Sequence, residues 1–342
     1  MKLSAQVSVT SDAQMELVYP IRESADSDGW LQKQGMYIMV RIRSIEYGLY
    51  PRSEHVRLSI SKWERNALEH KLLGKLIDAE KKEILKLFNQ SGINFYTDPL
   101  INWQDILRMV ASLSLDTPFE KISRYRETNT FYRQPLVESY PRMGEIREEE
   151  STPDSHLPGS MYVSDNSDHY MYFLPGIESF VNMSFLSPEL NRDRVMDSFL
   201  EIYLDLIKKH GMKRILLFEP YPDSHFYEGN SDIFGSAQVF YVRYGLIDES
   251  FSKSKDARPF SLIASNEKEL VGAARHSEVP GIALMNAQNT YLENPEKLTK
   301  SATKMSSALK LDEIFVTHTE YFDFLPHVIA NKKVGILGKV GE

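Results

Sequence analysis

Helical segments that are each followed by a short apolar run are the feature that most constrains the fold of this chain. Over residues 67–90, apolar side chains recur on one helical face, and residues 93–96 then read as a short strand. A second helix is expected to start at Ser187-Pro188, where a capping hydroxyl precedes proline, and to end at Gly211. The run over residues 214–218 follows, as expected for a strand buried on both faces.

The alternation continues along the chain. Three more apolar runs cover residues 260–264, 282–285 and 314–317. They are separated by two helical stretches, residues 267–276 and 295–309. An earlier strand is expected over residues 38–50. Helix–strand alternation in many units implies a mostly parallel sheet with helices outside. We therefore predict an α/β fold, a (β/α)8 TIM-type barrel of some irregularity, with its active face at the C-terminal strand ends.

The expected domain organisation is an extension followed by the barrel. Residues 1–44 are expected to form an N-terminal extension packed on the barrel, and residues 45–342 the barrel itself. No internal repeat is found.

The chain contains no cysteine, which excludes disulfides, zinc–thiolate sites, iron–sulfur clusters and thiol nucleophiles. The formal net charge is −8 without a long basic run, so we expect no nucleic-acid partner. No apolar stretch approaches the ~20 residues of a membrane span, and the first residues lack the apolar segment of a secretory signal. A cytoplasmic protein without a membrane partner is expected.

Two clusters of oxygen and imidazole side chains could ligate a metal ion. One holds Asp223 and His225, and the other holds His318 and Glu320. Such ligands suit zinc, manganese or iron. The alternative is that these are loop side chains that meet water or each other.

Glu219 is the candidate catalytic residue. It follows a buried strand directly, where a carboxyl with a perturbed pKa would serve as a general acid or base or anchor a ligand. Aromatic pairs such as Tyr321-Phe322 could floor a pocket for a planar ligand such as a pterin, although core packing is the alternative.

Further candidates for ligand binding are polar residues near strand ends. Arg52 could pair with a ligand carboxylate or form an internal salt bridge. Asp98 could hold an ammonium group or serve as a turn carboxylate. Asn129 could orient a polar ligand or cap a loop. Asn286 and Asn289 could reach the barrel mouth or cap the backbone.

Short motifs follow one another at the expected strand ends. They are Gly48-Leu49-Tyr50-Pro51-Arg52-Ser53, Thr97-Asp98-Pro99 with Asp105 downstream, the stretches 127–132 and 174–176, Phe218-Glu219-Pro220, and the stretches 286–290 and 317–326. In this order they resemble the motifs of cobalamin-independent methionine synthase, over roughly residues 45–340. The resemblance is to one of the two barrel domains of that family and to its stand-alone archaeal-type relatives. It also makes Ser53 a ligand-binding candidate.

The resemblance implies a (β/α)8 barrel and methyl transfer from a methylated folate or related pterin to the sulfur of homocysteine. The family's zinc, held by His, Glu and two Cys, lowers the pKa of the thiol. Here Glu320 stands at one cysteine position, and residues 261–266 lack the His and Cys of the matching segment. A carboxylate is harder than a thiolate and donates less electron density to zinc, so the family's zinc site is not expected. Phe218 stands where the family has an aspartate that meets the homocysteine amine.

Two functional hypotheses remain open at this point. In the first, the protein binds the methyl carrier or associates with a catalytic methionine-synthase barrel, much as the zinc-free N-terminal barrel of the two-barrel enzymes helps to bind folate. In the second, it is an independent enzyme with a His/carboxylate or metal-free site in the same barrel mouth. A homo-oligomer and a barrel kept only for structure are further alternatives.

Overall fold

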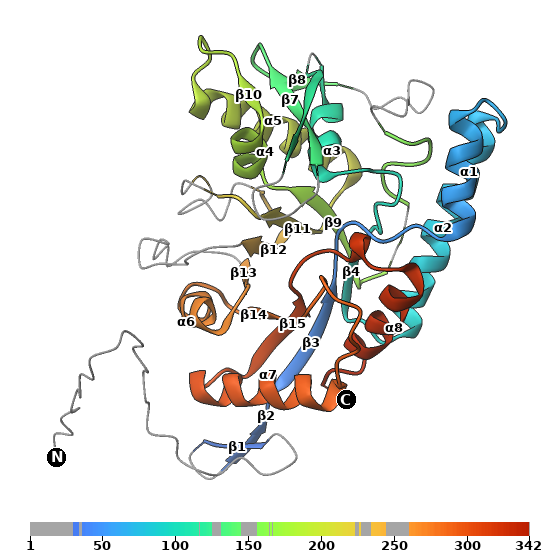
Figure 1. The fold of residues 1–342 in the computed structure, drawn as a ribbon. Helices are drawn as coiled ribbons and strands as arrows, with labels where there is room; N and C mark the ends of the chain where they lie inside the picture. Colours follow the sequence, from blue (N-terminus) through green and yellow to red (C-terminus); the bar gives the residue numbers. More distant parts are fainter. Residues whose placement is uncertain are drawn as a thin grey trace, which may run out of the picture.

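A closed barrel of eight parallel strands forms the centre of the molecule (Figure 1). The computed structural model describes residues 30–33, 36–115, 117–124, 131–144, 156–163, 165, 167–222, 226, 234–243 and 260–341. The barrel strands, in their order around the ring, are β3 (Arg41–Glu46), β4 (Phe95–Thr97), β9 (Tyr170–Pro175), β11 (Arg214–Glu219), β12 (Gln238–Arg243), β13 (Phe260–Ala264), β14 (Gly281–Met285) and β15 (Glu313–His318). β15 pairs with β3 and closes the ring, so the predicted (β/α)8 barrel is confirmed.

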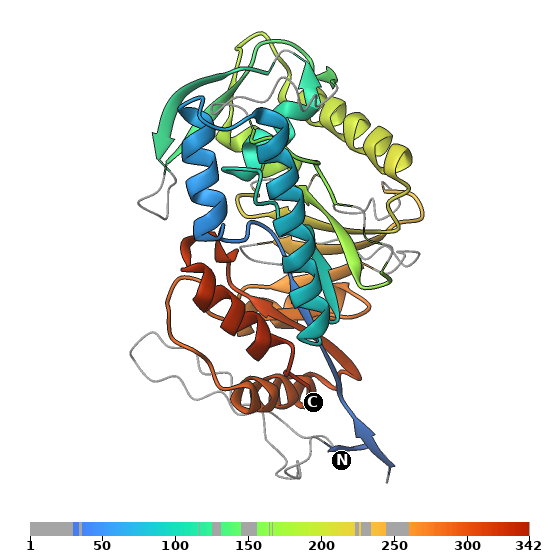
Figure 2. The same cartoon turned by 90° about the vertical axis from the view of Figure 1, so that its right-hand side faces the viewer.

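Helices cover the outside of the barrel. They are α1 (Glu54–Glu64) and α2 (His70–Gln90) after β3, α3 (Ile106–Leu113) after β4, α4 (Ile177–Met183) and α5 (Arg192–His210) after β9, α6 (Glu267–His276) after β13, α7 (Pro295–Leu309) after β14, and the 3-10 helix η2 (Phe322–Phe324) with α8 (His327–Leu337) after β15. Figure 2 shows the long α2 running along the barrel beside α8. Between β11 and β12 the described residues contain no α-helix, which makes the barrel irregular there. None of the helices in the described ranges is long and apolar enough to cross a membrane.

Three small sheets lie outside the barrel. β1 (Trp30–Lys33) pairs antiparallel with β2 (Met36–Met39), which leads into β3. A three-stranded sheet consists of β6 (Phe119–Arg124), β7 (Phe131–Val137) and β10 (Phe185–Leu186). A two-stranded sheet consists of β5 (Ser114–Leu115) and β8 (Arg142–Met143). Figure 1 shows β7, β8 and β10 grouped near α3, α4 and α5.

Local signals placed several elements correctly and misplaced two. α5 begins later than the Ser187-Pro188 signal predicts, because Asn191 is its N-cap and accepts a hydrogen bond from the Arg194 N–H at 3.0 Å. The strand predicted over residues 38–50 is divided between β2 and β3. Gly211 ends α5 in the left-handed conformation, with a φ of 58°, as predicted. The division at residue 44 between extension and barrel stays a prediction.

Aromatic side chains from strands that are not neighbours fill the barrel interior. The ring centroids of Phe95, Phe240 and Phe315 lie 5.1 to 5.8 Å apart, although β4, β12 and β15 do not pair with one another. Gly281 makes room for them, since a Cβ there would lie 2.4 Å from Cδ1 of Ile263 and 3.0 Å from Cβ of Phe315. Because strand residues alternate between faces, the inward side chain of Phe95 means that the residue two positions along β4 also faces the barrel interior.

The last described residues pack where the ring closes. A Cβ on Gly341, whose φ is +92°, would lie 2.7 Å from the carbonyl oxygen of Ile42 in β3. The end of the chain therefore lies against the beginning of the first barrel strand.

Candidate functional site

The inner face of the barrel mouth is aromatic in the described residues. The ring of Phe218, near the end of β11, lies 5.6 Å from Tyr47, 6.0 Å from Phe173 and 5.1 Å from Tyr321. Tyr47 follows β3 and Tyr321 follows β15, so rings from across the mouth meet on Phe218. Phe218 is 2% exposed, whereas Tyr321 is half-buried. The position at which the resembled family carries an aspartate is therefore apolar and packed.

Tyr321 lies directly on the backbone of Gly48. Gly48 has a φ of +86°, and a Cβ there would lie 2.7 Å from Cδ1 of the Tyr321 ring. Both the backbone conformation and the contact require glycine. The Gly48 N–H donates to Oγ1 of Thr97 at 3.0 Å, which ties this turn to the end of β4.

Glu219 points away from the barrel axis, because strand alternation turns it to the face opposite Phe218. Its Oε1 accepts the Ser179 N–H at 2.5 Å in the first turn of α4, and its side chain is fully buried. A Cβ on Gly176, the N-cap of α4, would lie 2.2 Å from the Glu219 carboxyl carbon. Burial raises the pKa of Glu219 to about 8, against the opposing effect of the Ser179 hydrogen bond. Glu219 thus accepts a backbone N–H at the start of α4, where the N-cap residue Gly176 has no side chain to do so.

Asp98 forms a buried ion pair with Lys81 of α2. The Lys81 Nζ lies 3.0 Å from Asp98 Oδ1, and both side chains are 0% exposed. Lys81 also donates to the carbonyls of Ser160 at 2.8 Å and Met161 at 3.2 Å. Asp98 Oδ2 accepts the Val163 N–H at 2.8 Å. An ammonium group does lie against Asp98, and it belongs to this chain.

His318 and Glu46 form a second buried pair, between the ends of β15 and β3. His318 Nε2 lies 3.2 Å from Glu46 Oε2, and Nδ1 lies 2.6 Å from the carbonyl oxygen of Glu320, which requires the proton on Nδ1. The imidazole stacks on Tyr47 with centroids 4.5 Å apart. Burial raises the pKa of Glu46, and the nearby His318 opposes this. Sequence reasoning missed Glu46, since nothing in its neighbourhood along the chain marks it.

Arg52 and Ser53 hold loops together. Arg52 donates from Nε to the carbonyl of Ile101 and from Nη2 to that of Trp103, both at 2.6 Å. Burial lowers the pKa of Arg52 to about 10. Ser53 is the N-cap of α1, and its hydroxyl also bonds to Glu80.

Asp323 lies just beyond Tyr321, close behind the candidate cluster of His318 and Glu320 in the sequence. Its Oδ1 is buried and has no hydrogen-bond partner in the described part of the chain. Burial raises the pKa of Asp323 to about 7; the negative charge of Glu320 adds to this and the positive charge of Arg52 opposes it.

The two asparagines of the loop after β14 support turns. Asn286 Oδ1 accepts the Gln288 N–H at 2.7 Å, and Asn289 Oδ1 accepts the Tyr291 N–H at 3.1 Å. The Gln288 side chain donates to Glu320 Oε1 at 2.9 Å, so the loops after β14 and β15 are joined.

Three predicted site residues, Asn129, Asp223 and His225, lie outside the described residues. Within the described part, no three His, Asp or Glu side chains gather as a metal site would need. The residues do not fit the family's zinc, because the thiolate donors are missing from the sequence and His318 uses Nδ1 for a backbone carbonyl. The structure therefore brings His318 and Glu320 together through that carbonyl. It keeps Glu219 and Asp98 apart: Glu219 contacts the start of α4, and Asp98 contacts Lys81 of α2.

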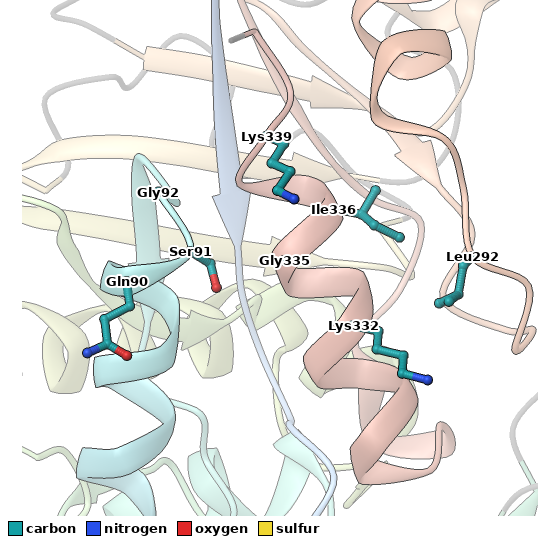
Figure 3. Close-up of a pocket in the computed structure, with 8 residues that line it drawn as sticks. All are labelled: Gln90, Ser91, Gly92, Leu292, Lys332, Gly335, Ile336 and Lys339. Carbon is teal, nitrogen blue, oxygen red and sulfur yellow. The ribbon is translucent and has the colours of Figure 1, made fainter.

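A shallow cavity of about 600 Å³ lies outside the barrel, between the end of α2 and α8 (Figure 3). Ser91, Leu292, Lys332 and Lys339 are among its lining residues. None of the predicted site residues lines it.

No protein-family model and no curated protein sequence matches the chain. Solved structures do match. A B12-independent methionine synthase from Shewanella sp. W3-18-1, solved in complex with selenomethionine, superposes with a TM-score of 0.62 at 13% identity, over 87% of this chain and 96% of that one. A putative vitamin-B12 independent methionine synthase from Listeria monocytogenes gives 0.58 at 10% identity, over 86% and 95%. At such identities the likeness concerns the fold: this chain has the same barrel architecture as those two structures.

Proposed function

We propose that this protein is a methionine-synthase-related barrel that takes part in methyl transfer from a methylated pterin or folate carrier to homocysteine, as a carrier-binding partner of a catalytic barrel. The shared fold and the order of the strand-end motifs support the relationship. The observation that carries the partner role is Phe218, a packed phenyl ring on the inner face where the family places an acid.

The chemistry of the reaction supports the same division of labour. Attack on a methyl group needs a stabilised thiolate, and the chain has no cysteine to hold zinc for that purpose. Among the described residues, each of the strand-end acids contacts a group of the chain: Glu46 lies near His318, Asp98 near Lys81, and Glu219 Oε1 accepts the Ser179 N–H. Glu46 Oε2 and Glu219 Oε2 are buried and have no hydrogen-bond partner there. A barrel of this kind can bind and orient a carrier while another subunit supplies the activated thiol.

The test is reconstitution with a zinc-loaded catalytic methionine-synthase barrel. Methionine formation from 5-methyltetrahydrofolate and homocysteine is measured with and without this protein, and sedimentation velocity reports complex formation. We expect no turnover by this protein alone, and a severalfold faster reaction or a lower KM for the carrier in the mixture. A heat-denatured sample is the control. If no complex forms and the rate does not change, the proposal is refuted.

A second candidate is an independent enzyme with a redesigned site, favoured by the buried Glu46–His318 pair. Such a pair is a conventional acid–base arrangement, although it is enclosed by Tyr47 and Phe322. Elemental analysis and turnover by the isolated protein test it. Stoichiometric metal that is lost in Glu320→Ala, or turnover that is lost in Glu46→Gln, would favour this candidate over the first.

A further inference from the structure

The cavity between the end of α2 and α8 has a glycine in its floor. Gly335 lies within α8, and a Cβ at this position would meet no atom within 4 Å. Figure 3 shows Gly335 between Ser91 on one side and Leu292 on the other. Glycine destabilises a helix relative to alanine, and no described neighbour lies close enough to require it here. What the glycine contributes is open space, in a cavity whose volume of about 600 Å³ suits a small molecule.

Two lysines that line this cavity stand on either side of Gly335 along the helix. Lys332 precedes it by three residues, and Lys339 follows it by four, in the turn after α8, so the two lie roughly 10 Å apart along the axis. Both are exposed, and neither ammonium group makes an ion pair or a hydrogen bond within the described ranges. The nearby carboxylate of Glu293 is held by Lys333, whose Nζ lies 2.7 Å from its Oε2.

The ends of the two helices do not use these ammonium groups either. Lysines near a helix C-terminus often donate to its last carbonyl oxygens. Here backbone N–H groups of residues 91–93 donate to the carbonyls of residues 87–89 in α2. Backbone N–H groups of residues 338–340 donate in the same way to the carbonyls of residues 334, 336 and 337 in α8. Both lysines are therefore available to a ligand.

The two walls of the cavity differ in chemistry. The wall from α2 offers the Gln90 amide and the Ser91 hydroxyl, and the opposite wall offers the apolar side chains of Leu292 and Ile336. Leu292 is 47% exposed. No Asp or Glu is among the described lining residues. Hydrogen-bond donors on one side, apolar surface on the other and two cations between them suit an anion that is attached to an apolar body.

We infer that this cavity binds a phosphate monoester carried on a small apolar or aromatic group. The phosphate lies over Gly335 on the side of Ser91, where both ammonium groups reach its oxygens, and the apolar group lies against Leu292. At neutral pH a phosphate monoester carries nearly two negative charges, which matches the two lysines. The same chemistry occurs in soluble organic phosphates and in the headgroup of phosphatidic acid. The site lies outside the barrel and is independent of the proposed function.

The experiment is a calorimetric titration of the full-length protein with phenyl phosphate, inorganic phosphate and phenol. Phenyl phosphate should bind about tenfold more tightly than inorganic phosphate, because its ring buries apolar surface against Leu292 and Ile336. Phenol lacks the charge and should give no heat of binding. Sedimentation with vesicles of phosphatidylcholine, with and without phosphatidic acid, distinguishes a lipid headgroup from a soluble ester.

Matched variants test the residues that carry the inference. Lys332→Gln and Lys339→Gln should each weaken phenyl phosphate binding by about tenfold, since each removes a charge-assisted hydrogen bond. Lys209→Gln, at an exposed lysine in the last turn of α5, is the control and should bind like wild type. Gly335→Ala places a methyl group on the cavity floor and should weaken binding by about fivefold or more without lowering the thermal unfolding temperature.

The outcomes decide both the site and the source of the ligand. Binding that is weakened in Lys332→Gln, Lys339→Gln and Gly335→Ala, and kept in Lys209→Gln, supports the site. Under that result, additional binding to phosphatidic acid vesicles identifies a lipid headgroup, and its absence identifies a soluble ester. If neither phenyl phosphate nor the vesicles bind, or if Lys209→Gln weakens binding as much as Lys332→Gln, the inference is wrong. The reconstitution with a catalytic barrel tests the proposed function separately.

Discussion

Phe218 and Glu219 are neighbours in the sequence and belong to different regions of the molecule. Phe218 is part of an inward layer of rings at the barrel mouth, whereas Glu219 is part of an outward layer of titratable groups between the strands and the helices. Asp98 and Glu46 lie in the outward layer as well, where Lys81 and His318 meet them. The inward layer is stabilised by ring packing. In the outward layer, Lys81 and His318 lie against Asp98 and Glu46, and a backbone N–H meets Glu219. Adjacent residues at a strand end can therefore carry unrelated roles.

The largest effect is expected in the outward layer, from Lys81→Met. It leaves Asp98 buried without its cation, and breaking a buried pair from one side costs about 3–5 kcal/mol. Urea unfolding measures the loss. Lys82→Met, at an exposed position of the same helix, is the control and should change little. Asp98→Asn added to Lys81→Met should recover part of the loss; a loss below about 1 kcal/mol in the single variant would contradict the importance of pairing.

The inward layer is tested by Phe218→Ala. Removing a fully packed ring leaves a cavity, and a loss of about 3 kcal/mol in the free energy of unfolding is expected. Phe324→Ala is the comparison, since Phe324 is 51% exposed and should cost little. Equal losses in the two variants would show that the rings around Phe218 do not form a packed layer.

Gly176→Ala tests the boundary between the strands and the helix layer. The new methyl group would occupy the place of the Glu219 carboxyl, so we expect a loss of about 1–3 kcal/mol in chemical denaturation. Gly335→Ala in α8 meets no atom within 4 Å and should be neutral or slightly stabilising. If the two variants were equally stable, the Glu219 carboxyl group would not lie against Gly176.

The proton on Glu219 gives an effect that is small within any one pH unit and that accumulates with pH. Its pKa rises from 4.5 to about 8 on folding, so between these values the folded protein binds the additional proton. Stability from this group is complete below pH 4.5 and is lost as the pH rises towards 8, by about 1 kcal/mol per pH unit. Glu219→Gln has no such proton, so wild type should lose stability relative to it from pH 5 to 8. Parallel pH profiles in urea titrations would contradict this.

The fold could be predicted because its signals are local. The caps and apolar faces of α6 and α7 and the apolar run of β13 place these elements where the sequence analysis expects them. The shift of α5 has the same origin, since Asn191 competes with Ser187 as a cap and carries the hydrogen bond.

The orientation of the strand-end residues could not be predicted. Strands of a parallel barrel are apolar on both faces, so the sequence of β11 contains no alternation to tell which way Phe218 or Glu219 points. Only the ring contacts across the barrel show that Phe218 points inward and Glu219 outward. The sequence contained one signal for a buried ion pair. Lys81 falls on the buried stripe of α2 with Ile77 and Ile84, where a lysine requires a carboxylate partner. The ligand roles assigned to Arg52, Ser53, Asn286 and Asn289 stay predictions.

The seam between β15 and β3 means that the ring has no intrinsic first strand. Because Gly341 packs on Ile42, the two edges of the barrel sequence meet in space. A circular permutant that joins Gly341 to the start of β3 by a short linker, without the residues before β3, and opens the chain in another loop keeps every strand pairing of the barrel. Such a rearranged chain would make it possible to place a tag or a fused catalytic barrel at either end of the molecule, and so to choose which face a partner approaches.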